Sequence, residues 1–213
     1  MTAATRELIE RSLAGTRPGD LLAETAVPDD VPVELRAGWP AALMPAAVLV
    51  PLLERPGGIH ALLTERAAGL THHAGQIAFP GGRVEPEDSG PLAAAVREAG
   101  EEIGLPPQLI EPAGYLDVCV TATGFAVVPV VAFVGAGFSA RLDVREVRAV
   151  FEAPLEHLLD PVNHVRRTRR VRGVTVPVYE IACAGRLIWG ATAAMLVGFS
   201  RQLALQKNNE INR

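Results

Sequence analysis

The chain has 213 residues, 49% of them hydrophobic, and its 20 Lys and Arg against 24 Asp and Glu give a formal net charge of −4. This length suits one domain with a sizeable core, and the acidic balance leaves no broad basic field, so we expect no nucleic-acid partner. The longest apolar runs, 41–53 and 125–138, contain Pro and fall short of the ~20 residues of a membrane helix, and the N-terminus lacks a secretory pattern, so we expect a cytoplasmic protein with no membrane partner. Cys119 and Cys183 lie in apolar strand-like segments; they could pair, but we expect two buried thiols.

The first part of the chain predicts a helix, an irregular segment and a hairpin. Residues 1–15 have a helical pattern, and the proline-rich stretch 17–40 follows it. The apolar runs 46–52 and 59–64 flank Pro56-Gly57-Gly58, which is a hairpin signal.

Residues 79–105 predict a strand end, a glycine loop and a capped helix. Pro80 sets φ, and Gly81-Gly82 permits positive φ or a close approach of the backbone. Pro91 suits the first turn of a helix, and Gly104 followed by proline ends it.

Three glutamates, Glu98, Glu101 and Glu102, crowd this helix. Like charges three or four residues apart on a helix repel by roughly 0.2–0.5 kcal/mol per pair. They form a stripe on the edge of the buried face, beside a core stripe of Leu92, Ala95, Val96, Ala99 and Ile103. Three carboxylates held side by side suit a hard divalent ion such as Mg²⁺ or Mn²⁺. A solvated acidic face is the alternative.

The second half predicts further strands and a terminal helix. We expect strands over 116–121 and 127–134, a strand and a short helix over 144–159, a hairpin over 174–181 and 186–189, and an amphipathic helix over 191–205. Mixed strands with two main helices predict an α/β fold, an α/β/α sandwich with a mixed central sheet. The predicted boundaries are an N-terminal helix and irregular lead-in over 1–40, the folded domain over 41–205, and a polar, frayed tail over 206–213.

The acidic helix resembles the second half of the Nudix hydrolase box. That box runs Gly, five residues, Glu, seven residues, then Arg-Glu-aliphatic-x-Glu-Glu-x-Gly-aliphatic, and Arg97–Leu105 matches every fixed position of the second half. The first half departs from the pattern. Counted from Gly82, the acid is Asp88 rather than Glu, and eight residues separate it from Arg97. We therefore assign no role to Asp88.

The segment before the helix is similar to the signature of the coenzyme A pyrophosphatase branch of Nudix hydrolases. Leu62-Leu63-Thr64-Glu65-Arg66-Ala67, Gly75 and Phe79-Pro80-Gly81-Gly82 match it, but Thr71 stands where the branch has a second Arg. His72 and His73 follow and could replace the lost cation, although a solvent-facing histidine pair is the alternative. Later segments also resemble the branch, so that the likeness spans residues 42–200; they are 115–117, 121–125, 154–161 and 188–193.

The resemblance implies a Nudix fold and a site for Mg²⁺ or Mn²⁺, which would neutralise a diphosphate and activate water. The main metal ligands of the family map to Glu98 and Glu102, and a further ligand maps to Glu101. The backbone carbonyl that the family's loop glycine contributes falls at Gly81 or Gly82.

Catalytic and substrate-binding roles follow from the same resemblance. Arg97 maps to the residue that orients the carboxylates. The base is either a glutamate of the helix or an acid from a later loop; Glu146 is the candidate for the latter, and a plain surface residue is the alternative. Arg66, Phe79 and the two loop glycines are the expected substrate-binding residues.

The implied reaction is hydrolysis of coenzyme A or acyl-CoA to 4′-phosphopantetheine, or its acyl form, and 3′,5′-ADP. Another nucleoside diphosphate derivative, such as NADH, ADP-ribose or a dinucleoside polyphosphate, is one alternative, and a non-catalytic binder is the other. Many relatives are dimers, which leaves a homodimer open. Tyr115 or Phe125 could stack on adenine, and a run of arginines could bind the 3′-phosphate unless it is simply a solvated loop; the run is Arg166, Arg167, Arg169, Arg170 and Arg172.

Overall fold

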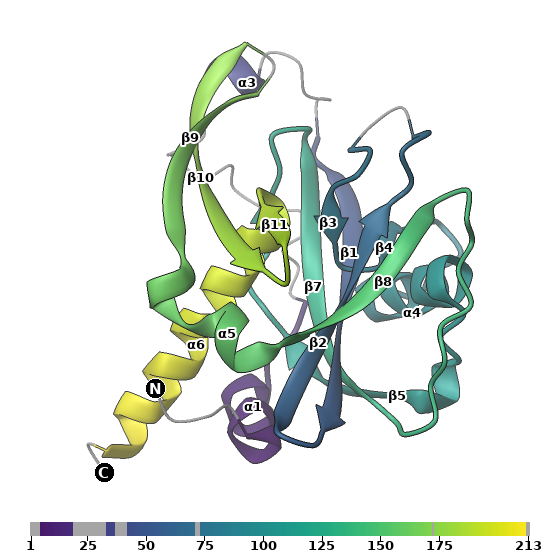
Figure 1. Ribbon diagram of the computed structural model, residues 1–213, viewed down its shortest axis with the longest axis vertical. Helices are drawn as coiled ribbons and strands as arrows, with labels where there is room; N and C mark the ends of the chain where they lie inside the picture. Colours follow the sequence, from purple (N-terminus) through teal and green to yellow (C-terminus); the bar gives the residue numbers. More distant parts are fainter. Residues whose placement is uncertain (1–4, 19–32, 37–41, 71–72, 172, 212–213) are drawn as a thin grey trace.

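The structure, a computed structural model, describes residues 5–18, 33–36, 42–70, 73–171 and 173–211 (Figure 1). Its helices are α1 (Arg6–Leu13), α3 (Val33–Arg36), α4 (Pro91–Ile103), α5 (Leu155–Leu159) and α6 (Ala191–Ile211). Its strands are β1 (Met44–Arg55), β2 (Gly58–Arg66), β3 (Ile77–Ala78), β4 (Gly81–Arg83), β5 (Ile110–Tyr115), β6 (Cys119–Val120), β7 (Phe125–Val134), β8 (Val147–Pro154), β9 (Val165–Val171), β10 (Val174–Cys183) and β11 (Arg186–Trp189). Three positions singled out from the sequence lie outside the described residues: Thr71, His72 and Arg172.

The main sheet is mixed, as predicted. Strands β1 and β7 lie parallel in its middle, with Met44 opposite Phe125 and Leu52 opposite Phe133. Both strands are almost continuously apolar, which is typical of strands covered on both faces. The order is β3-β2-β1-β7-β5, with β4 and β8 beside β1 and β2 and with β6 beside β7, and these other pairings are antiparallel. A second, antiparallel sheet has the order β11-β10-β9.

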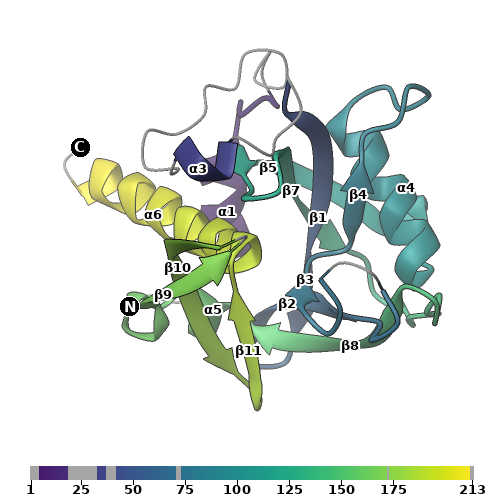
Figure 2. The ribbon, with the colours of Figure 1, turned by 90° about the horizontal axis from the view of Figure 1, so that it is seen from above.

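Helices cover both faces of the main sheet, which confirms the predicted α/β/α sandwich (Figures 1 and 2). On one face, α4 packs Ala99 and Ile103 against β1 and β7. The other face carries α1, α5 and α6, where Ile9 and Phe199 are fully buried in the larger of the two clusters. The second sheet lies on the α6 side of the molecule (Figure 2).

The strand predicted over 116–121 is wrong. Only the two-residue β6 forms there, and the longer strand β5 precedes it. Pro112 and Gly114 argue against a strand in the sequence, but β5 lies at the edge of the sheet, and its pairing with β7 shifts register between these two residues. An edge strand with such an irregularity tolerates proline and glycine.

Two further expectations need correction at the C-terminal end. Helix α6 continues to Ile211, so residues 206–211, which we expected to fray, extend the helix. The arginines of the run other than Arg172, expected on a loop, lie in the edge strand β9 of the second sheet. The two predicted hairpins and the short helix α5 are confirmed.

Cys119 and Cys183 are both free thiols. Within the described ranges, no helix is long and apolar enough to cross a bilayer.

Candidate active site

The glycine loop passes so close to its neighbours that side chains would not fit. Strand β4 pairs with β1, which places Gly81 opposite Val48. A Cβ on Gly81, whose φ is +154°, would lie 2.3 Å from the carbonyl oxygen of Ala47. A Cβ on Gly82 would lie 2.5 Å from Oε1 of Glu98. The loop backbone therefore lies directly against a carboxylate of helix α4.

The three glutamates of α4 have different environments, which corrects the prediction that they share one edge of the buried face. The side chain of Glu102 is 4% exposed, that of Glu98 is 16% exposed, and that of Glu101 is 64% exposed. Glu102 therefore belongs to the buried face of the helix, and Glu101 points into solvent. The helix ends as predicted, because Gly104 adopts a left-handed conformation with φ of 68°.

Glu102 is a buried carboxylate with little positive charge around it. The backbone N–H of Gly81 donates to its Oε2 at 3.2 Å, and Nη1 of Arg66 lies 3.7 Å from its Oε1. Burial disfavours the ionised form and raises the pKa of Glu102 to about 7, against the opposing effects of Arg66 and the Gly81 N–H. Near neutral pH, this carboxyl group is poised between its protonated and ionised forms.

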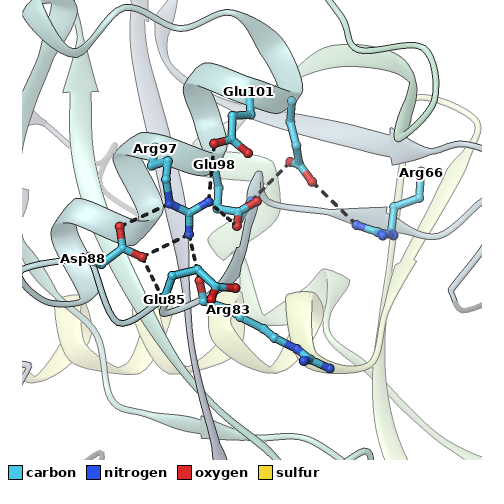
Figure 3. Close-up of polar contacts among 9 residues, drawn as sticks. Arg66, Arg83, Glu85, Asp88, Arg97, Glu98 and Glu101 are labelled. Atoms are coloured by element: carbon cyan, nitrogen blue, oxygen red, sulfur yellow. Dashed lines mark hydrogen bonds and ion pairs between the residues drawn. The ribbon is translucent and has the colours of Figure 1, made fainter.

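Arg97 connects the helix to the loop that precedes it (Figure 3). Its Nε and Nη2 donate to the two carboxylate oxygens of Asp88 at 3.2 and 3.0 Å. Its Nη1 donates to Glu98 at 2.8 Å and lies 3.6 Å from Glu101, and its Nη2 also donates to the carbonyl of Arg83 at 3.0 Å. Four hydrogen bonds and the ion pair with Glu101 thus converge on one guanidinium, which holds the carboxylate of Glu98 in place.

Asp88 is the site residue that the sequence reasoning missed. Its carboxylate faces Arg97 in a bidentate arrangement, and this interaction holds the pKa of Asp88 below its ordinary value. A turn holds this carboxylate in place: the Asp88 N–H donates to the carbonyl of Glu85, and the Glu85 N–H donates back to the Asp88 carboxylate. The sequence signal for this role was the acidic residue at the position where the Nudix pattern has its first glutamate.

Glu146 lies on the loop before β8. Its carbonyl accepts from the N–H of Ala67, directly after Arg66, and its side chain is exposed. Its negative charge contributes to the raised pKa of both Glu98 and Glu102, although burial is the larger cause for each. Glu146 is therefore within electrostatic reach of the helix carboxylates.

The remaining residues that the sequence analysis singled out lie at different distances from the glutamates of α4. Arg66 ends β2 at a shift in register with β8, which directs it toward α4. Phe79 is 3% exposed and packs in the larger core cluster, so it anchors the loop and offers almost no surface to a substrate. Tyr115 is half-buried beside α4. The arginines of β9 lie in the second sheet, where Arg169 pairs with Glu180.

The donors at this site fit a divalent cation. Among the residues that the structure describes, no three His, Cys, Asp or Glu side chains are already arranged to hold a metal ion. Glu98 and Glu102 nevertheless lie against the glycine loop with a raised pKa, and the guanidinium of Arg66 lies 3.7 Å from Glu102. Because burial makes these two carboxylates costly to ionise, a bound cation would strongly stabilise their ionised forms.

Comparisons with known proteins identify the family. Residues 43–172 match the NUDIX domain. NudL, an uncharacterized Nudix hydrolase, is 44% identical over 167 residues in both Salmonella paratyphi B and Salmonella newport, and the match covers 76% of this chain and 81% of each relative. Among solved structures, the Nudix hydrolase RenU of M. smegmatis is 25% identical with a TM-score of 0.48, covering 55% of this chain and 74% of that one. A C. elegans Ap4A hydrolase is 23% identical with a TM-score of 0.46, covering 52% and 80%.

The chain therefore belongs to the Nudix hydrolases. It is an enzyme of the Nudix pyrophosphatase type, and this family generally uses divalent metal ions.

Proposed function

We propose that this Nudix hydrolase cleaves the diphosphate of coenzyme A or of an acyl-CoA into 4′-phosphopantetheine, or its acyl form, and 3′,5′-ADP. One observation carries the proposal. Arg66 and Gly81, which both belong to the segment similar to the coenzyme A branch, contact the two carboxylate oxygens of the same Nudix-helix residue, Glu102. A segment that selects the substrate would then act directly beside the diphosphate that reacts.

The proposed metal ligands are Glu98 and Glu102, with Glu101 and the backbone carbonyl of Gly82 as further donors. Mg²⁺ or Mn²⁺ suits such an all-oxygen set. When bound, the ion supplies positive charge against the diphosphate and activates a water molecule. Arg97 keeps the carboxylate of Glu98 in place at 2.8 Å, so that this ligand does not have to be ordered when the ion arrives.

Arg66 is the proposed contact to the diphosphate. Its guanidinium is one-quarter exposed and faces Glu102 at 3.7 Å, which is longer than a good hydrogen bond. Its Nε is buried without a hydrogen-bond partner in the described part of the chain. An unsatisfied buried donor is costly, so a phosphoryl oxygen that accepts from Arg66 would be bound favourably.

The general base is one of two kinds of group. Glu146 lies on a loop within electrostatic reach of Glu98 and Glu102, whereas Glu101 is on the helix and open to solvent. Loss of a general base typically lowers the rate by 10²–10⁴-fold. We propose to assign the role by comparing kcat for Glu146→Gln and Glu101→Gln at saturating metal, where the loss of a further metal donor is compensated and only the base variant should show a loss of that size.

The experiment that tests the function is product analysis. Purified protein with Mg²⁺ or Mn²⁺ should convert coenzyme A to 4′-phosphopantetheine and 3′,5′-ADP, identified by chromatography and mass spectrometry. Excess EDTA and Glu98→Gln should each abolish turnover, whereas Glu7→Gln on α1, an exposed glutamate paired with Arg11, should retain it. If coenzyme A remains intact while NADH or ADP-ribose is cleaved, the substrate assignment is wrong.

That second outcome defines the alternative function, a Nudix pyrophosphatase for another nucleoside diphosphate derivative. Thr71 favours it, since this position carries a cation in the coenzyme A branch. A substrate panel run under the same conditions separates the two.

A further inference from the structure

Three arginines surround the glycine loop, and one of them has no acidic partner. Arg66 faces Glu102, and Arg97 is bound by Asp88 and Glu98. The guanidinium of Arg83 has no carboxylate partner among the described residues, and its side-chain contact is the ring of Phe125, whose centroid is 5.5 Å from Cζ. Its charge is therefore available to an anion that comes from outside the protein.

The strand register places Arg83 on the opposite face of the sheet from the helix carboxylates. In β4, Gly82 pairs with Ala47, which packs in the cluster under α4. The next residue, Arg83, pairs with Ala46, which packs in the cluster under α1 and α6. Because successive residues of a strand alternate between faces, the side chain of Arg83 leaves the sheet on the side away from α4.

Figure 3 shows this divergence. The backbone carbonyl of Arg83 accepts from Arg97 beside the acidic cluster, but the side chain extends away from that cluster. The backbone of Arg83 thus contacts Arg97 beside the proposed metal ligands, while its guanidinium points away from them. A substrate with a second anionic group, separated from its diphosphate, would meet both.

We propose that Arg83 binds the phosphate on the ribose of the substrate, the 3′-phosphate of coenzyme A, with Phe125 as the platform that orients the guanidinium. This inference rests on the proposed function and adds a subsite to it. Arg66 and the proposed metal lie on the α4 side of the sheet, where they would face the diphosphate. A second phosphate of the substrate, on the other side of the sheet edge, would then lie near Arg83. The planar fork of arginine suits a terminal phosphate, which presents several oxygens at once.

The arrangement also changes the expectation for Phe125. Phe125 was one of two candidates to stack on adenine, but the guanidinium of Arg83 already lies over its ring. Phe125 is half-buried and packs against the larger core cluster, which gives the arginine a fixed support. Such a cation–π contact holds the charged group without neutralising it.

The test compares coenzyme A with 3′-dephospho-coenzyme A as substrates of the metal-loaded enzyme. Wild type should prefer coenzyme A in kcat/KM by about 10- to 100-fold, the size expected for a hydrogen-bonded charge pair. Arg83→Gln should lose most of this preference by losing activity on coenzyme A alone, and Arg83→Lys should restore part of it. Arg11→Gln, on the remote helix α1, should keep the wild-type ratio. The backbone bond to Arg97 persists in both Arg83 variants, so the diphosphate site stays intact.

If Arg83→Gln keeps the wild-type ratio, whether by leaving both activities unchanged or by lowering both equally, the subsite is overturned while the proposed function stands. If wild type cleaves neither compound, the proposed function fails, and binding decides the subsite separately. Calorimetry with metal-free protein should then show that wild type binds 3′,5′-ADP more tightly than 5′-AMP and that Arg83→Gln does not. Equal affinities in wild type would refute the subsite.

Discussion

Replacing Glu102 by Gln removes a buried charge while keeping the shape of the side chain and its acceptor for the Gly81 N–H. The pKa of Glu102 is raised from 4.5 to about 7, so the folded protein holds this proton at a higher pH than the unfolded chain does. Between these two values the folded state binds more protons, and the stability of the metal-free wild type therefore falls as the pH rises through the window. At about 1.4 kcal/mol per unit, the loss amounts to about 3 kcal/mol.

In EDTA, we therefore expect Glu102→Gln to be more stable than wild type by up to about 3 kcal/mol at pH 8, which is about 6–12 °C in Tm for a protein of this size. The two proteins should have similar Tm values near pH 4.5, where Glu102 is protonated in the folded state. Thermal unfolding followed by circular dichroism between these pH values measures the difference. The same variant should be inactive in the presence of metal, because it lacks a proposed ligand.

The matched control is Glu101→Gln, on the same helix but 64% exposed, whose stability should stay within about 0.5 kcal/mol of wild type over the whole range. Mn²⁺ at pH 8 should raise the Tm of wild type and leave that of Glu102→Gln unchanged. If metal-free Glu102→Gln is less stable than wild type at pH 8, or if the gap does not close toward low pH, the account of the buried carboxylate is wrong.

Further predictions concern the loop. Gly82→Ala should push the carboxylate of Glu98 away and weaken metal binding roughly 10-fold or more, measured by calorimetry, with little change in Tm, since the clashing group is a movable side chain. Gly81→Ala clashes with the backbone of β1 and should lower stability by about 1–3 kcal/mol; equal Tm values for the two variants would contradict this distinction. Asp88→Asn should lower kcat about 10-fold because Arg97 loses its bidentate partner. It should also lower the free energy of unfolding at neutral pH, and this difference should shrink as the pH falls below 3.8, because protonation removes the same charge from wild type; a difference independent of pH would refute the role.

The sequence predicts the parts of the site that depend on local chemistry. Pro91 and Gly104 delimit helix α4 because the first fits a helix start and the second adopts the left-handed conformation at its end. The glycine loop and the ion pair between Arg97 and Glu101 likewise follow from spacing alone.

The parts that depend on the sheet could not be predicted in this way. A helical projection puts Glu98, Glu101 and Glu102 in one stripe, but which of them is buried depends on where β4 lies against α4. The role of Asp88 depends on a turn with Glu85 that directs its carboxylate toward Arg97. The direction of Arg83 depends on its pairing with β1, and nothing in its immediate neighbours along the chain indicates it.

Helix α1 has a practical consequence for expression of the enzyme. It lies before the segment 43–172 that matches the NUDIX domain, yet its Leu8, Ile9 and Leu13 are buried against the main sheet and α6. Each such side chain contributes about 1.5–3 kcal/mol when buried, against a typical total stability of 5–15 kcal/mol. A protein truncated to the matching segment would expose this apolar surface to solvent and aggregate. Recombinant versions of the enzyme should therefore begin before Arg6 and extend through α6.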